Sequence, residues 1–540
     1  MRPYNFLLIE CILLCAAFSA LTEMHAAADD WVREGSSWKY RYDDGTFENR
    51  GWKWIDGDRD CVTECYYFRD DGTIIESGET PDGYRVDSTG AWVKDGKRQE
   101  HEAQVSFAVT GDNLIHGQLI RFGQQTGSFD FLYQWELSQE LKAADLAVLN
   151  QETIYVDDPG SYSGYPAFGT PLAVGEAALK AGFNLAACAT NHSLDKGMAA
   201  IDTTAAFYEA RGIPYIGIQP TAHAAYEPFK LLTVNGVRLA LFDYTYGTNG
   251  IPIPSGFPHA VHMLTNPNMV RTELAAGRAA ADAVIVFVHW GDEYEAEPSV
   301  YQRSWARVFL ESGVDVVVGG HPHVLQPVEL LRREDGHQML VYYSLGNMVS
   351  RQDSSECSIG GLAEFTLTRT PEGCRVTEYE LKPLITHQTW DFSTACLLDK
   401  YPSELAAAHR MGLTIPQWQE LFAALTKGTG AYWGTPSRVT KEKQGTGGDA
   451  VSAAAGSSAD NSEYSDASAA SDSLNEETAA SAVIYAETKA ESSEAETEPE
   501  TEAESETQVS YARAGADPVV HSETLPAMIQ YQTEEYSEQD

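Results

Sequence analysis

Basic residues are scarce in this chain of 540 residues, which has 37 lysines and arginines against 79 aspartates and glutamates and a formal net charge of −42. Nucleic-acid binding needs basic faces that neutralise phosphates, so the composition argues against nucleic acid as a partner. From Asp449 onward, 22 acidic residues stand against only Lys489 and Arg513. Such a segment cannot bury enough apolar surface to fold. We expect residues 436–540 to be a disordered acidic tail, either a solvated spacer or a site for a cation or partner.

Long apolar runs are also missing. The stretch Phe6–Ala20 follows Arg2 and precedes the small residues Ala26 to Ala28, a pattern typical of a signal peptide over residues 1–28. This stretch is too short for a membrane span, and no later segment approaches about 20 apolar residues. We therefore expect a secreted or extracellular protein with no integral membrane segment after processing.

Closely spaced cysteine pairs of the Cys-x-x-Cys kind are absent among the eight cysteines, so nothing indicates a structural zinc site. Cys61 and Cys65 are close enough for a local disulfide, which an extracellular compartment permits, but two reduced cysteines on a hairpin fit equally well. Cys188 lies in an apolar strand and is expected to be a small core residue.

What the chain does have is a set of apolar strands that each end in a residue able to bind metal. The strands are Val105–Val109, Leu146–Leu149, Leu185–Ala189, Val284–Val288 and Asp315–Val318. The residues that follow them are Asp112, Glu152, Asn191 with His192, His289, and the pair His321 and His323. Each one alone could be a turn or core residue. In α/β sheets, however, ligand sites lie beyond the carboxyl ends of the strands, so together these residues predict one metal site.

These positions also carry an ordered set of motifs. They are Gly111-Asp112, Asn150-Gln151-Glu152, Thr190-Asn191-His192 with Asp195, His289-Trp290-Gly291 with Glu293, Gly320-His321-Pro322-His323, and Ser344-Leu345-Gly346-Asn347. In this order they resemble the CapA family of bacterial capsule and poly-γ-glutamate synthesis, which is similar to the calcineurin-like metallophosphoesterases. The resemblance covers roughly residues 103 to 385. It implies a layered, metallophosphoesterase-like α/β sandwich.

The resemblance also implies roles. Asp112 and His323 would hold one divalent metal ion, Glu152 would bridge two, and Asn191, His289 and His321 would complete the second. His192, with Asp195, would be the catalytic pair, His192 acting as the general acid. Glu293 and Asn347 are further candidates. Carboxylate, amide and imidazole donors suit Mn, Fe or Zn.

The chain departs from the phosphoesterase pattern at two positions. Leu114 stands where a histidine is expected two residues after the first aspartate, and His116 could replace that histidine if the turn were helical. Glu152 takes a place where aspartate is usual. Two functions therefore stay open: a dimetal hydrolase or transferase acting on a phosphoester or envelope-polymer bond, and a capsule-assembly factor that binds an acidic polymer through metal without turnover. Other capsule-synthesis subunits are expected partners of either.

Residues 29–100 differ in composition from the rest of the chain, with short aromatic stretches and Asp-Gly pairs in a loose repeat. This pattern predicts serial β-hairpins. The stretch from Thr80 to Val93 resembles the cell-wall-binding repeats of the choline- and glucan-binding type. In such hairpins, aromatic rings hold a quaternary ammonium or a sugar face. A small β domain with an aromatic core is the alternative. The candidate wall-binding aromatics are Trp38, Trp52, Trp54, Tyr66, Tyr67, Tyr84 and Trp92.

Residues 101–435 are expected to form the α/β domain with a helical extension at its end. Periodic apolar residues predict helices over Phe129–Ala143, Pro171–Ala181, Gly197–Arg211, Met269–Ala280 and Ser299–Ser312, and a helical stretch between Trp390 and Lys427. The segment Thr245–His262, rich in Gly, Pro and His, is expected to border the site as a substrate loop or to be a surface excursion. Cell-wall or capsule polymer is the expected partner, in a cell-wall-associated, Gram-positive-like setting.

Overall fold

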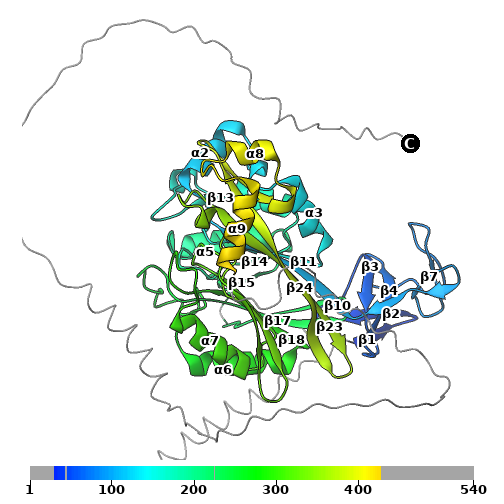
Figure 1. The fold of residues 1–540 in the computed structure, drawn as a ribbon. Coiled ribbons are helices and arrows are strands. Elements are labelled where there is room, and N and C mark those ends of the chain that lie inside the picture. Colours follow the sequence, from blue (N-terminus) through cyan, green and yellow to red (C-terminus); the bar gives the residue numbers. More distant parts are fainter. Residues whose placement is uncertain (1–29, 43–44, 224, 427–540) are drawn as a thin grey trace, which may run out of the picture. The chain divides into compact units, whose positions relative to one another are not determined.

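The computed structural model describes residues 30–42, 45–223 and 225–426. Two sheets pack face to face, and helices cover their outer faces (Figure 1). The predicted layered α/β sandwich is confirmed. The predicted signal peptide and acidic tail lie outside the described residues. Within the described part, no helix is both long enough and apolar enough to cross a bilayer.

The first sheet has eight strands in the order β15-β14-β11-β10-β23-β24-β25, with β22 paired to the end of β10. Strands β10, β11, β14 and β15 are parallel, whereas β23, β24 and β25 are antiparallel neighbours. The strands are β10 (Gln104–Asn113), β11 (Leu146–Asn150), β14 (Leu185–Ala187), β15 (Tyr215–Ile216), β22 (Asn347–Val349), β23 (Ile359–Thr370), β24 (Gly373–Gln388) and β25 (Ser393–Leu397).

The second sheet has six strands in the order β16-β17-β18-β19-β21-β20. Its four central strands are parallel, and an antiparallel strand closes each edge. The Asn235-Gly236 turn joins β16 to β17. The strands are β16 (Lys230–Val234), β17 (Val237–Thr245), β18 (Ala283–His289), β19 (Val316–Gly320), β20 (Val328–Arg332) and β21 (Gln338–Tyr342).

Alternating side chains explain why the two sheets form a sandwich. Successive residues of a strand point to opposite faces, so a strand that is apolar throughout must be covered on both sides. In β18, Ile285 and Phe287 enter the core between the sheets, while Val284 and Val286 pack under the outer helices. The parallel strands of both sheets follow this rule, and their carboxyl ends therefore open at one edge of the sandwich.

Six helices form the outer layers. The first sheet is covered by α2 (Gly117–Thr126), α3 (Trp135–Ala143), α4 (Leu172–Ala181) and α5 (Gly197–Glu209), and the second by α6 (Pro267–Ala280) and α7 (Val300–Glu311). Two later helices, α8 (Ser403–Ala408) and α9 (Ile415–Leu425), pack through Trp418 and Phe422 in a separate apolar cluster that includes Ile385 of β24.

Two helix predictions need correction. The helix expected from Phe129 begins at Trp135, because Tyr133 forms a β-bridge to Ala395 and the Gln134 amide donates to the Ala395 carbonyl. The stretch between Trp390 and Lys427 was expected to be helical, but its first part is strand β25, which pairs with β24. In both cases a strand partner far along the chain competes with the local helical pattern.

The amino-terminal region consists of short antiparallel strands. They are β1 (Asp30–Glu34), β2 (Ser37–Arg41), β3 (Gly51–Ile55), β4 (Val62–Phe68), β5 (Gly78–Glu79), β6 (Arg85–Val86), β7 (Trp92–Lys94), β8 (Lys97–Arg98) and β9 (Glu100–Glu102). Strand β9 pairs with β4 and runs across the predicted boundary at residue 100. A buried ion pair between Asp56 and Arg369 of β23 fastens this region to the first sheet. Cys61 and Cys65 are free thiols.

One turn recurs four times in this region. The amides of Gly45, Gly72, Gly83 and Gly90 each donate to the carbonyl three residues earlier, and the residue that supplies this carbonyl donates its own amide to the carbonyl four residues later. All four glycines have positive φ, between 79° and 90°. A side chain at such a position would be strained, so Gly is required to close each hairpin. The recurring turn gives the loose sequence repeat a structural basis.

Candidate metal centre

The metal-ligand candidates meet at the carboxyl edge of the sandwich. Asp112 ends β10, Glu152 follows β11, Asn191 follows β14, His289 ends β18, and His321 and His323 follow β19. All six are almost fully buried, with exposed fractions between 0 and 3%. Two different sheets supply them, so no short segment of the chain contains the centre.

The first group consists of Asp112, Glu152 and His323, whose ligand atoms lie within 4.8 Å of one another. His323 Nδ1 is 2.9 Å from Asp112 Oδ2 and 3.1 Å from Asn347 Oδ1, and its Nε2 is 3.7 Å from Glu152 Oε1. The other Asp112 oxygen accepts a hydrogen bond of 2.6 Å from Asn150 Nδ2. Asn347 therefore orients His323, and Asn150 orients Asp112, through these hydrogen bonds.

The second group is arranged around His289. Its Nε2 lies 2.9 Å from Asn191 Oδ1 and 3.6 Å from the same Glu152 Oε1 that faces His323. The ring of His321 stands 4.9 Å from that of His289, centre to centre. Glu152 thus lies between the two groups, which is the position a bridging ligand needs.

The turn that carries His321 and His323 is strained. Both residues have positive φ, 98° and 60°, in a region that residues with a side chain rarely adopt. Gly320, just before them, cannot carry a side chain, because a Cβ there would lie 2.5 Å from Asp112 Oδ1 and 2.6 Å from Asn150 Nδ2. Strain of this kind persists where it serves a site, and here it aims two imidazoles at one point.

The donors fit divalent metal ions. Two atoms that each lie about 2.1 Å from one ion are about 3.0 to 3.4 Å apart, close to the separations of 2.9 to 3.7 Å found here. Both Glu152 oxygens and His321 Nδ1 are buried without a hydrogen-bond partner among the described residues. Buried polar atoms are nearly always paired, so these unpaired atoms indicate that a ligand belongs between them.

The buried carboxylates and imidazoles of the centre shift one another's pKa values. Burial alone would raise the pKa of Glu152, but the nearby His323 and His289 hold it below its usual value. Burial opposes the charge of His323, yet Glu152 and Asp112 raise its pKa to about 9. Burial and the neighbouring His289 and His323 lower the pKa of His321 well below its usual value. The metal-free centre therefore combines a charged Glu152 with a neutral His321, and His323 must release a proton when it binds metal.

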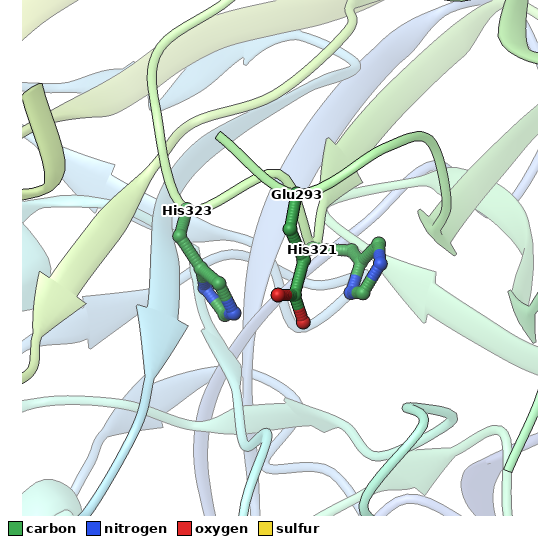
Figure 2. Close-up of side chains that lie close together, drawn as sticks. All are labelled: Glu293, His321 and His323. Carbon is green, nitrogen blue, oxygen red and sulfur yellow. The ribbon is translucent and has the colours of Figure 1, made fainter. Parts of the chain in front are cut away.

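Glu293 joins a further group with His321 and His323, again with ligand atoms within 4.8 Å of one another. Figure 2 shows its carboxylate between the two imidazoles, reaching in from the segment that follows His289. Unlike the buried ligands, Glu293 is exposed.

His192 and Asp195 form a buried pair beside these groups. His192 Nδ1 donates to Asp195 Oδ2 at 2.6 Å, and the same oxygen accepts the Phe168 amide at 2.7 Å. The ring of Phe168 packs edge-on against the imidazole, with centres 4.7 Å apart. The carboxylate thus fixes the tautomer and orientation of His192.

The structure does not bring Leu114 or His116 into the metal groups. Leu114 is buried and its amide donates to the Val349 carbonyl. His116 has extended backbone just before α2, not the helical turn that a ligand role required. Its Nδ1 accepts the Arg351 amide at 3.2 Å, and burial lowers its pKa to about 4.

Three neighbours of the site carry no recognisable signal of their own in the sequence. Asn249 Oδ1 accepts from Asn191 Nδ2 at 3.1 Å, which turns the Asn191 oxygen toward His289. Tyr246 packs its ring 4.5 Å from that of His321. Both lie in the Thr245–His262 segment, whose lack of periodicity was the only available hint. Phe168, far from any motif, had none.

The seven aromatic candidates of the amino-terminal region separate into two sets. Tyr66 and Trp38 pack in or against the apolar cluster of Tyr40, Phe68 and Ile74. The other set surrounds Trp52, whose ring lies 5.3 to 6.0 Å from those of Tyr67, Tyr84 and Trp92, while Trp54 lies 6.4 Å from Trp92. Tyr84 is 48% exposed. The sequence did not separate core rings from surface rings.

Comparison with known proteins supplies the family. The model described as bacterial capsule synthesis protein PGA_cap matches residues 106–352. Residues 106–352 belong to the CapA family. It is 29% identical over 288 residues to the capsule biosynthesis protein CapA of Bacillus anthracis, covering 50% of this chain and 66% of that protein. It is 27% identical over 207 residues to the PGA biosynthesis protein CapA of Bacillus subtilis, covering 38% and 52%.

This CapA-family chain thus spans between about half and two thirds of the length of these relatives. Among solved structures, the NAD nucleotidase of Haemophilus influenzae is similar at 11% identity and a TM-score of 0.31, covering 59% of this chain and 67% of that one. The match to the family model, residues 106–352, contains every metal-ligand candidate described above.

Proposed function

We propose that this chain is an exported CapA-family protein that acts in capsule, poly-γ-glutamate or envelope-polymer metabolism as a dimetal hydrolase or transferase on a phosphoester or polymer bond. The observation that carries the proposal is the buried His192–Asp195 pair, with a 2.6 Å hydrogen bond, beside a centre whose Glu152 oxygens are unpaired. A protein that only binds metal and polymer has no use for an oriented imidazole next to its metal ligands.

Each residue has a role in this proposal. Asp112 and His323 would hold one ion, Asn191, His289 and His321 would hold the other, and Glu152 would serve both. Two bound ions would supply Lewis acidity and lower the pKa of an attacking water. Mn, Fe and Zn all suit this donor set.

His192 serves as the general acid. Its Nδ1 proton stays on the hydrogen bond to Asp195, so the proton that His192 transfers as an acid must be carried on Nε2, the other ring nitrogen. The Asp195 carboxylate stabilises this imidazolium. His192 Nε2 then protonates the leaving oxygen, and a positioned acid of this kind contributes about 10²- to 10⁴-fold in rate.

A second function, metal-dependent polymer binding without turnover, is favoured by one observation. The position that should carry a histidine is Leu114, and His116 points its Nδ1 to a backbone amide instead of a metal. A centre with one ligand fewer holds its first ion less tightly and could bind an acidic polymer through that ion.

Turnover of bis(p-nitrophenyl) phosphate separates the two functions. The full chain is stripped with EDTA, reloaded with Mn²⁺, Fe²⁺ or Zn²⁺, and assayed beside His192→Ala. We expect metal-dependent hydrolysis that His192→Ala loses while it keeps its metal. Metal binding without hydrolysis of this diester or of capsule polymer would favour the binding function.

We further propose a location outside the cell. The predicted signal peptide exports the chain, and the aromatic set around Trp52, Tyr84 and Trp92 attaches it to cell-wall or capsule polymer. The ring of Tyr84 stands perpendicular to those of Trp52 and Trp92, with centres 5.9 and 5.7 Å away, and Tyr84 is 48% exposed and so accessible to a ligand. Other capsule-synthesis subunits are the proposed protein partners.

A further inference from the structure

The first ion of the proposed centre lacks a protein ligand that the sequence pattern leads one to expect. Its group contains three titratable donors, Asp112, Glu152 and His323. Leu114 has no side-chain donor atom, and His116 Nδ1 accepts a hydrogen bond from the Arg351 amide. Asn347 holds the ring of His323 and directs its own amide group to the His323 and Cys357 carbonyls.

Glu293 lies beside His321 and His323, where a further donor is needed. One of its carboxylate oxygens is within 4.8 Å of ring nitrogens of both His321 and His323 (Figure 2). His323 belongs to this group and to the Asp112 group, so the two groups join at one imidazole. The Glu293 carboxylate approaches His323 from the solvent side. The other donors around this imidazole come from the interior of the sandwich.

The segment that carries Glu293 is fastened to the same turn as the two histidines. The Tyr294 amide donates to the Pro322 carbonyl at 2.8 Å, between His321 and His323. Gln326 Nε2 donates to the Glu295 carbonyl at 2.8 Å, and Gln326 is itself held by Gln302 Nε2 at 2.7 Å. Because these bonds already place the backbone, binding an ion requires little ordering of Glu293.

We infer that Glu293 is a metal ligand that supplies, from beside His321 and His323, a donor that Leu114 cannot supply. This inference rests on the metal centre of the proposed function, though not on its catalytic activity. It exchanges a neutral imidazole for a charged carboxylate, which gives the centre three carboxylates: Asp112, Glu152 and Glu293. Additional hard oxygen favours Mn²⁺ or Fe²⁺ over Zn²⁺ relative to an imidazole-rich centre.

Metal binding tests the inference without any assay of turnover. The full chain is stripped with EDTA and titrated with Mn²⁺ by calorimetry, and bound metal is counted by elemental analysis. Glu293→Gln keeps the size of the side chain and removes its charge. Glu295→Gln is the matched control, because Glu295 is exposed in the same segment and lies outside all three metal groups.

We expect two Mn²⁺ per chain in the wild type and in Glu295→Gln. Glu293→Gln should bind one of the two at least about tenfold more weakly, since even loss of an outer-shell partner costs 10- to 100-fold. Glu293→His should move the preference from Mn²⁺ toward Zn²⁺. Equal melting temperatures of the metal-free proteins would show that the variants fold.

The other outcomes are equally informative. Unchanged Mn²⁺ affinity in Glu293→Gln overturns the inference, and equal weakening in Glu293→Gln and Glu295→Gln reduces it to the general charge of the segment. A wild type that binds no metal overturns both this inference and the proposed centre. A wild type that binds two ions but hydrolyses nothing removes the proposed activity alone and leaves the ligand role of Glu293 in place.

Discussion

Replacing Glu152 with glutamine should lower stability without metal and should lower it further with metal. In the metal-free protein, the Glu152 carboxylate is fully buried and neither of its oxygens has a hydrogen-bond partner among the described residues. Burial raises the pKa of this carboxyl, but His323 and His289, 3.7 and 3.6 Å away, hold the pKa below its usual value and so stabilise the charge. Glu152→Gln removes this charge and leaves the buried charge of His323 without one partner, so the metal-free variant should unfold with a lower free energy than the wild type.

With metal the difference should grow. A ligand that binds only the folded state adds about 4.1 kcal/mol when its concentration is 1,000 times its dissociation constant, so two ions would add about 8 kcal/mol. Glu152 faces both groups through the same Oε1. Glu152→Gln should therefore lose at least one ion and about half of the stabilisation by metal.

The measurement is thermal or urea unfolding of wild type and Glu152→Gln in EDTA and in saturating Mn²⁺, with bound metal counted by elemental analysis. Glu295→Gln again controls for the loss of one acidic group. Equal metal content and equal stabilisation by Mn²⁺ in wild type and Glu152→Gln would refute the bridging position. Unchanged stability in EDTA would show instead that the Glu152 carboxylate contributes nothing to the metal-free fold.

Three further predictions follow from other parts of the structure. His192→Ala should keep both ions and lose about 10²- to 10⁴-fold in turnover, whereas His321→Ala should lose metal and activity together; equal metal loss in both would make His192 a ligand. Burial lowers the pKa of His262 to about 4 and both its ring nitrogens lack partners, so the unfolded chain, with a histidine pKa near 6.5, binds the proton first as pH falls. His262 should therefore contribute about 2 kcal/mol less stability at pH 5 than at pH 7.5, a loss that urea unfolding should show in wild type and not in His262→Leu. Trp52→Ala with Trp92→Ala should release the full chain from purified cell walls without changing its metal content; competition by choline would indicate a cation cage, and unchanged wall binding would make these rings a structural core only.

Many strands and helices, and the meeting of the ligand candidates at one edge, could be predicted from the sequence because each rests on a local pattern. Short apolar runs such as Val284–Val288 are typical of strands covered on both faces, and parallel strands place their following residues at one edge. The helix predicted over Ser299–Ser312 is observed at Val300–Glu311, where Ser299 and Gln302 form a capping box.

What the sequence could not supply depends on distant partners. Strands β23 and β24 are less regularly apolar and gain their order from pairing with β10 and with each other. The start of α3 is set by Ala395, more than 250 residues away in the chain. The orientation of Asn191 by Asn249, and the occupation of His116 by Arg351, are likewise contacts between segments with no sequence signal that joins them.

The placement of the centre couples metal to the whole sandwich. Asp112, Glu152 and Asn191 come from the first sheet, and His289, His321 and His323 come from the second, so any ion shared between them links the two sheets across their open edge. Without metal, the Glu152 oxygens at this edge have no hydrogen-bond partner among the described residues. A metal ion would give these oxygens a partner. Gly320 and the fastened Tyr294 segment hold His321 and His323 at positive φ, and this keeps the donors arranged for an ion before it arrives.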